Sequence, residues 1–175
     1  LRDWDSEYFK VAIIEMLNKF QFALKQKTII FGGIIILWGI SSCSGSRPEK
    51  LGLKNKLFAP CPGSPNCVLS LQSDAKHLIL PLAYTGSLEV AKERLNQVIL
   101  SHENARIITQ NGDYWHVEFT SRWMSFVDDV EFYFMESEEL IHVRSASRMG
   151  YYDYEVNRKR VEKIRFRFEK LVNGS

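Results

Sequence analysis

The sequence lacks the signatures that most catalytic and cofactor-binding proteins carry. It has no Gly-x-Ser-x-Gly motif around a nucleophilic serine and no glycine-rich loop of the kind that holds phosphates. It has no Cys-x-x-Cys or paired-histidine motif, so we predict no metal and no cofactor. The formal net charge is only +2, which excludes the whole molecule as a strong binder of polyanions. These absences favour a binding module over an enzyme.

Length and composition fit one ordinary globular domain. The 175 residues leave room for one domain rather than two. A chain with 45% apolar and 25% charged residues is neither disordered nor wholly embedded in a membrane. The charge is uneven, because residues 158–170 hold seven of the 23 basic residues and only two acidic ones. The sequence has only three cysteines. Disulfides use cysteines in pairs, so in an exported protein one of the three needs another role.

Residues 16–43 have the order of an export segment. Three lysines precede an uncharged apolar run at 29–40, and two serines then lead to Cys43. The run is shorter than the roughly 20 residues that span a bilayer. Its ending, Ile-Ser-Ser-Cys, resembles a bacterial lipobox, which predicts cleavage before Cys43 and attachment of lipid to its sulfur. An uncleaved anchor helix is the alternative.

Both alternatives place the following domain on the exported side of a membrane, in a bacterial envelope or a plastid or thylakoid lumen. The membrane is then a partner through the lipid or the anchor, and a nucleic-acid partner is disfavoured. We interpret residues 1–15 as an upstream extension, 44–56 as a tether rich in Gly, Ser, Pro and Lys, and 57–173 as the globular domain.

The remaining two cysteines flank a short loop. Residues 57–70 read LFAPCPGSPNCVLS, and their three prolines exclude a helix or a central strand. In an oxidising compartment we predict a disulfide between Cys61 and Cys67. A metal pair is the alternative, but it needs two further soft ligands.

The periodicity of residues 77–173 predicts an α+β fold. Apolar residues at three- and four-residue spacing indicate helices at 87–101 and from about Asp153 onward. Period-two alternation and an Asn-Gly turn indicate antiparallel strands. The strand candidates are 77–84 (an edge segment), 106–110, 114–120, 127–135 and 140–148. We predict a single domain in which a meander of three to five strands carries two amphipathic helices on one face.

The alternation also predicts a polar, open face of the sheet. If the turns centre near Ser125 and between residues 137 and 138, one row across three strands consists of Glu118, Glu131 and Arg144. The next row is His116, Tyr133 and His142. Such groups suit acid–base catalysis, so the alternative function is a hydrolase or isomerase that uses His116, Glu118 and Glu131. A charge ladder between strands is the structural interpretation, and we favour it.

Four arginines form a second candidate group: Arg144, Arg148, Arg158 and Arg160. Guanidinium groups, serine hydroxyls and a helix N-terminus together suit an anion such as phosphate or carboxylate. Alternatively, these arginines pair with Asp128, Asp129 and Glu131. The last helix has a basic face made up of Arg158, Lys159, Lys163, Arg167 and Lys170. Such a face suits anionic lipid head groups, although a run of basic residues more often marks a helix face exposed to solvent.

Several long motifs resemble one family. They are CPGSPNCV, HLILPL, VEFTSRWMSFVDDVEFYF and VRSASRMGYYDYEVNRKRVEKIR. They resemble the bacterial and plastid family known as domain of unknown function 1499, over about residues 57–170. That family has no established activity, so the resemblance implies domain limits and no chemistry. Its motif residues here are Arg122, Asp128, Asp129, Glu131, Arg144, Ser145, Ser147, Arg148, Asn157, Arg158 and Arg160. We expect a membrane-tethered module that binds a small anion or lipid head group.

Overall fold

The computed structural model describes residues 45–71, 74–122 and 124–174. The chain divides after Ser42 into two units, and the second of them contains all the described residues. The predicted export segment and Cys43 lie outside the described residues. Within the described part, neither helix has the length and apolar character that a membrane span requires.

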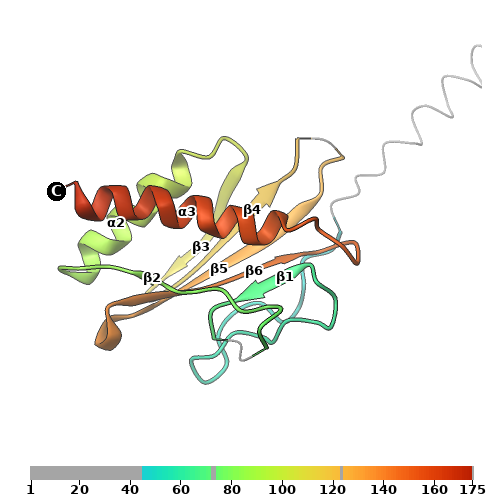
Figure 1. Ribbon diagram of the computed structural model, residues 1–175, viewed down its shortest axis with the longest axis horizontal. Coiled ribbons are helices and arrows are strands. Elements are labelled where there is room, and N and C mark those ends of the chain that lie inside the picture. The colour runs from blue at the N-terminus through green and yellow to red at the C-terminus, as the bar shows by residue number, and fades with distance from the viewer. Residues whose placement is uncertain (1–44, 72–73, 123, 175) are drawn as a thin grey trace, which may run out of the picture. The chain divides into compact units, whose positions relative to one another are not determined.

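A six-stranded antiparallel sheet forms the centre of the domain (Figure 1). Its strands are β1 (Cys67–Leu69), β2 (Leu82–Ala83), β3 (Ala105–Asn111), β4 (Tyr114–Thr120), β5 (Val127–Met135) and β6 (Leu140–Ser147). β3 to β6 follow one another as hairpins, and the short β1 and β2 both pair with β6. The predicted α+β meander is therefore confirmed. β1 was not predicted, and the segment at 77–84 forms only a two-residue strand.

Two helices cover one face of this sheet (Figure 1): α2 (Leu88–Leu100) and α3 (Val156–Asn173). Ser87 caps α2, because its hydroxyl accepts a hydrogen bond from the Val90 N–H. At the start of α3, the Asp153 carboxylate accepts from the backbone N–H groups of Glu155 and Asn157. Both helix starts thus lie close to where the sequence predicts them.

The core between helices and sheet uses the predicted alternation. Val117, Val130 and Ile141 are fully buried there, with Ile164 of α3 against them. Val156 is an apolar residue of α3 that lies outside this core, because its side chain is 46% exposed. It is the first residue of α3, and the buried position beside it belongs to Asn157.

The opposite face of the sheet is covered as well, which corrects the prediction of an open polar face. Residues 45–66 lie across it (Figure 1), and Phe58 packs there against Tyr133, together with Leu69 of β1. The interpretation of 44–56 as a tether missed these contacts, because from residue 47 onward the segment is bonded to the sheet.

The strand registers decide which polar groups meet. β5 and β6 pair as predicted, with Glu131 opposite Arg144. In contrast, β4 and β5 are shifted by two residues from the prediction, so that Glu131 lies opposite His116 and Asp129 lies opposite Glu118. The cause is the loop at 121–126, whose ends are joined by two hydrogen bonds between Ser121 and Phe126 and whose centre lies one residue earlier than expected.

The disulfide predicted between Cys61 and Cys67 is present, with the two Cα atoms 5.6 Å apart. Cys67 is the first residue of β1 and is opposite Ala146 of β6. The bond therefore connects the proline-rich loop directly to an edge strand of the sheet.

Breaking this disulfide should destabilise the domain. Closing a ring of this size removes entropy from the unfolded chain that corresponds to about 2 kcal/mol. We expect that loss in the free energy of unfolding when the full chain is denatured in urea with a reductant. The Cys61→Ala/Cys67→Ala variant should show the same low stability with or without reductant. Equal stability of oxidised and reduced wild type would contradict the prediction.

Candidate functional site

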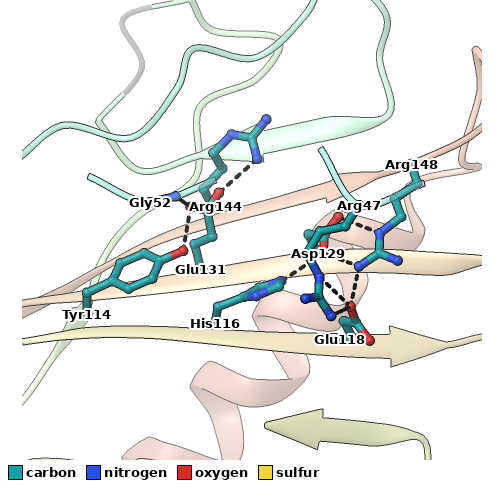
Figure 2. Close-up of polar contacts among 9 residues, drawn as sticks. All are labelled: Arg47, Gly52, Tyr114, His116, Glu118, Asp129, Glu131, Arg144 and Arg148. Atoms are coloured by element: carbon teal, nitrogen blue, oxygen red, sulfur yellow. Dashed lines mark hydrogen bonds and ion pairs between the residues drawn. The ribbon is translucent and has the colours of Figure 1, made fainter. Parts of the chain in front are cut away.

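Four charged groups and a histidine meet on the covered face of the sheet (Figure 2). The Arg148 guanidinium donates to both carboxylate oxygens of Asp129, at 2.9 and 2.7 Å, and also to Glu118. Arg47, from the N-terminal segment, donates to the same Glu118 oxygen at 3.1 and 2.6 Å. His116 Nε2 lies 2.8 Å from Asp129 Oδ1. We call these five residues the ion-pair cluster.

Glu131 forms a second buried centre beside the cluster (Figure 2). Its side chain is fully buried, and its carboxylate accepts three hydrogen bonds. The donors are the Gly52 N–H at 2.8 Å, the Tyr114 hydroxyl at 2.9 Å and the Arg144 guanidinium at 2.9 Å. Burial and the charge of Glu131 raise the pKa of Tyr114 well above its usual range. A buried carboxylate of this kind is tolerated because its lone pairs are occupied.

The cluster keeps its carboxylates ionised. Burial by itself would raise the pKa of Asp129, but the hydrogen bonds from Arg148 and His116 outweigh it and lower the pKa below its ordinary value. The pKa of Glu118 is lowered in the same way: burial opposes the shift, and the bonds from Arg47 and Arg148 decide it. The hydrogen bond to Asp129 raises the pKa of Arg148. Neither carboxyl is therefore suited to donating a proton near neutral pH.

The geometry brings a metal-compatible donor set together as well. One ligand atom each from His116, Glu118 and Asp129 lies within 4.8 Å of the others. However, Arg148 and Arg47 already donate to these carboxylates, so a cation would have to displace guanidinium groups.

The residues of the alternative catalytic hypothesis, His116, Glu118 and Glu131, lie close together, but they are on the face that the N-terminal segment covers. His116 and Glu131 are 4% and 0% exposed, and the Gly52 N–H is bonded to Glu131. A substrate would contact Glu131 only after the segment that contains Gly52 had left the sheet.

The predicted anion-binding arginines do not form one site. Arg144 and Arg148 lie on the covered face, because alternate residues of β6 point to opposite sides. Arg158 of α3 instead donates to the carbonyl oxygens of Leu78 and Lys76 at 2.8 and 3.1 Å. The alternative prediction, that these arginines pair with acidic residues, is correct for Arg144, Arg148 and Arg160.

The remaining motif residues link the sheet to α3. Arg160 pairs with Asp128. Asn157 accepts from the Ser145 hydroxyl at 2.5 Å and donates to Ser147 Oγ at 2.9 Å. These groups bond to one another in the helix-side interior and hold the start of α3 on the sheet.

A pocket on the helix side of the domain has an excess of positive charge, and we call it the basic pocket. It has a volume of about 450 Å³ and is lined by Ser101, His102, Glu103, Asn104, Arg122, Lys163 and Arg167. Arg122 pairs with Glu103 at 2.6 Å, and Arg167 donates to the Ser101 hydroxyl at 2.6 Å. Lys163 has no hydrogen-bond or ion-pair partner among the described residues. Three cations therefore share the pocket with one carboxylate.

His102 lies in the wall of this basic pocket. It also lines a neighbouring pocket of about 290 Å³ that shares Lys163 and Asn104. Its ring contacts the Phe119 ring edge-on, with centroids 5.6 Å apart, and its Nε2 is buried without a hydrogen-bond partner in the described structure. Burial, followed by the charges of Arg167, Lys163 and Arg160, lowers the pKa of His102 to about 4. The imidazole is therefore neutral at neutral pH among positive charges.

Sequence reasoning found the basic face of α3 but not this pocket. Residues 101–104 belong to the connection between α2 and β3, whereas Arg122 follows β4. Residues so far apart in the sequence carry no shared spacing, and only the packing of α3 brings them together.

Fold and site together define an α+β domain whose sheet is covered on one face by two helices and on the other by a disulfide-linked segment over buried ion pairs. The chain belongs to a protein family of unknown function, DUF1499, whose model matches residues 57–168. No curated protein and no solved structure matches the chain. The family match begins after Arg47 and Gly52, which both contact the buried carboxylates.

Removing the central cation of the ion-pair cluster should destabilise the fold strongly. Arg148→Met leaves Asp129 and Glu118 buried with too few donors, and we expect a loss of about 3 kcal/mol or more in urea unfolding. The matched control is Arg122→Met, which breaks an ion pair whose side chains are both 85% exposed and should change stability little.

The effect should also depend on pH. In the wild type, the lowered pKa values of Asp129 and Glu118 contribute stability above the ordinary carboxyl pKa, and this is lost as the pH falls through the lowered values. The deficit of the Arg148→Met variant should therefore shrink in acid. A deficit that stays constant with pH, or one equal to that of Arg122→Met, contradicts the prediction.

Proposed function

We propose that this protein is a membrane-tethered binding module of a cell envelope or organelle lumen, which holds a phosphate-like anion in the basic pocket beside α3. The anion is either a free solute or the phosphate of a lipid head group. The observation that carries the proposal is the excess of positive charge in the pocket, where Arg122, Lys163 and Arg167 face a single carboxylate.

The donors in the pocket suit a tetrahedral oxyanion. Guanidinium groups of Arg122 and Arg167 offer paired N–H donors, and Lys163 offers a mobile point charge without a competing partner. Most other arginines near the sheet are already bonded to carboxylates or carbonyl oxygens. An anion bound in this pocket would therefore be attracted by three cations and repelled by one carboxylate.

The tether rests on the sequence. The basic, apolar and small residues that end at Cys43 support export and attachment to a membrane, where anionic lipids are abundant ligands. A lipid anchor or an uncleaved helix would keep the pocket near such head groups.

The full chain should bind sulfate saturably, as measured by calorimetric titration. The Lys163→Gln/Arg167→Gln variant should bind at least about tenfold more weakly, since each lost charge-assisted bond contributes more than about 1.4 kcal/mol. The control, Lys54→Gln/Lys56→Gln, removes the same charge from an exposed turn and should bind as the wild type does. Equal binding by the two variants, or no saturable binding, overturns the proposal.

Competition distinguishes the two sources of the anion. Glycerol phosphate should displace sulfate in either case. Detergent micelles that contain phosphatidylglycerol should displace it only if the pocket admits a head group still attached to lipid.

Binding should also be linked to a proton on His102. A nearby anion favours the charged imidazole, so sulfate should raise the pKa of His102 from its value of about 4. Binding then takes up a proton, and affinity should rise as the pH falls from neutral toward that value. Ring-proton NMR of His102 with and without sulfate measures the shift. The His102→Gln variant should bind sulfate at neutral pH but lose most of the pH dependence of its affinity. A His102 resonance whose pKa is the same with and without sulfate would contradict this prediction.

A further inference from the structure

One end of the domain exposes a group of large apolar and aromatic side chains. Two loops contribute: 121–126, between β4 and β5, and 148–155, between β6 and α3. Arg148 N–H donates to the Val127 carbonyl at 3.2 Å, which holds the two loops at the same end of the sheet (Figure 1). The exposed side chains are Met124, Phe126, Met149, Tyr151, Tyr152 and Tyr154, from 37% to 84% exposed. We call them the loop end.

The chain enters the described domain at this same end. Gly45 packs so closely on the second loop that an added Cβ would lie 3.0 Å from Met149 Cγ and 3.1 Å from Arg148 Cβ. Two residues later, Arg47 is bonded to Glu118. Contacts at Gly45 itself and at Arg47 therefore fix the position of Gly45.

This position limits the distance between the loop end and any membrane anchor. In the sequence, Cys43 precedes Gly45 by two residues and Ile40, the last residue of the apolar run, precedes it by five. A residue adds at most about 3.6 Å of extended chain, so an anchor at either position would be joined to the loop end by a short stretch of chain. If either Cys43 carries lipid or the run is an anchor, Met149 is held close to the bilayer surface. The tether is much shorter than the range 44–56 predicts.

The chemistry of the loop end suits the boundary between head groups and acyl chains. Tyrosine is enriched at membrane interfaces, because its ring is apolar and its hydroxyl stays hydrated. Tyr151 and Tyr152 contact each other edge-on, with centroids 5.1 Å apart. Clustered exposed apolar residues on a soluble surface generally mark an interaction site.

The charges around the loop end are mixed, with the basic ones in excess on α3. The two acidic groups of the loop already have partners: Asp153 accepts backbone N–H groups, and Glu155 lies 3.7 Å from Lys159. The pocket that Val156 and Lys159 line continues to Lys163, so positive charge follows directly behind the aromatic side chains. Anionic phospholipids would meet both.

We propose that the loop end docks on the surface of an anionic phospholipid bilayer, with Tyr151, Tyr152 and Tyr154 at the level of the head groups. The proposal rests on the membrane tether of the proposed function but not on anion binding in the pocket. It assigns the domain one orientation, in which the β5–β6 turn and the end of α3 point away from the membrane.

The test uses the full chain in lipid discs of phosphatidylcholine and phosphatidylglycerol, with tyrosine rings isotopically labelled for NMR. A small fraction of lipid carries a gadolinium chelate on its head group. The signals of Tyr151, Tyr152 and Tyr154 should lose most of their intensity. Tyr84, which follows β2 toward the other end and is buried, should keep its signal and serves as the internal control.

A triple variant separates docking from simple proximity. In Tyr151→Ser/Tyr152→Ser/Tyr154→Ser, the methyl signals of Val156 should be more intense than in the wild type, because the loop end no longer docks on the bilayer surface. Unchanged Val156 broadening, or equal intensity loss at Tyr84 and the loop tyrosines, overturns the docking. So does loop-tyrosine broadening that requires a partner protein rather than lipid.

Sulfate titration of the triple variant keeps the two proposals apart. The variant should bind sulfate as the wild type does, because the pocket is intact. The Lys163→Gln/Arg167→Gln variant should conversely retain the broadening of Tyr151 and Tyr152. A full chain that does not enter the discs at all overturns the tether, and the docking with it.

Discussion

The structure depends on neutralising carboxylates that the sheet buries on its second face. Asp129 and Glu131 are 1% and 0% exposed, and an ion removed from water at such depth costs several kcal/mol unless donors replace the lost hydration. Arg144 of β6 and Arg148, the residue after β6, supply two of these donors. Tyr114 and His116 of β4 contact the same carboxylates, and the Gly52 N–H of the N-terminal segment donates to Glu131. The segment before the matched family region therefore takes part in neutralising this face, through Arg47 and Gly52.

That requirement decides where function can lie. Arg144 and Arg148 pair with buried carboxylates, and their own side chains are almost completely buried, so they serve the fold rather than a ligand in solution. Positive charge without such a commitment is found on the other side, where α3 meets the connection between α2 and β3. The division agrees with a protein whose polar interior is structural and whose binding chemistry lies at the surface.

A second pocket connects the basic pocket with the loop end: it is lined by Val156 and Lys159 at the start of α3, and it shares Lys163 with the basic pocket. A domain docked by its tyrosines would present the basic pocket to the head-group region. In the proposed tethered form, Gly45 adds a covalent reason for this orientation, because the predicted anchor precedes the domain at this end.

By itself, the sequence determined the α+β class, the helix starts near Ser87 and Asp153, the Cys61–Cys67 bond and the face on which each strand residue lies. These features follow from local spacing. Only the tertiary structure decided the β4–β5 register, because a shift of two residues leaves every side chain on its original face. It alone also decided that residues 45–66 cover the second face, and that Arg122, Lys163 and His102 share a pocket. Contacts between segments far apart in the chain depend on tertiary packing, and the spacing of apolar and polar residues along the sequence carries no information about it.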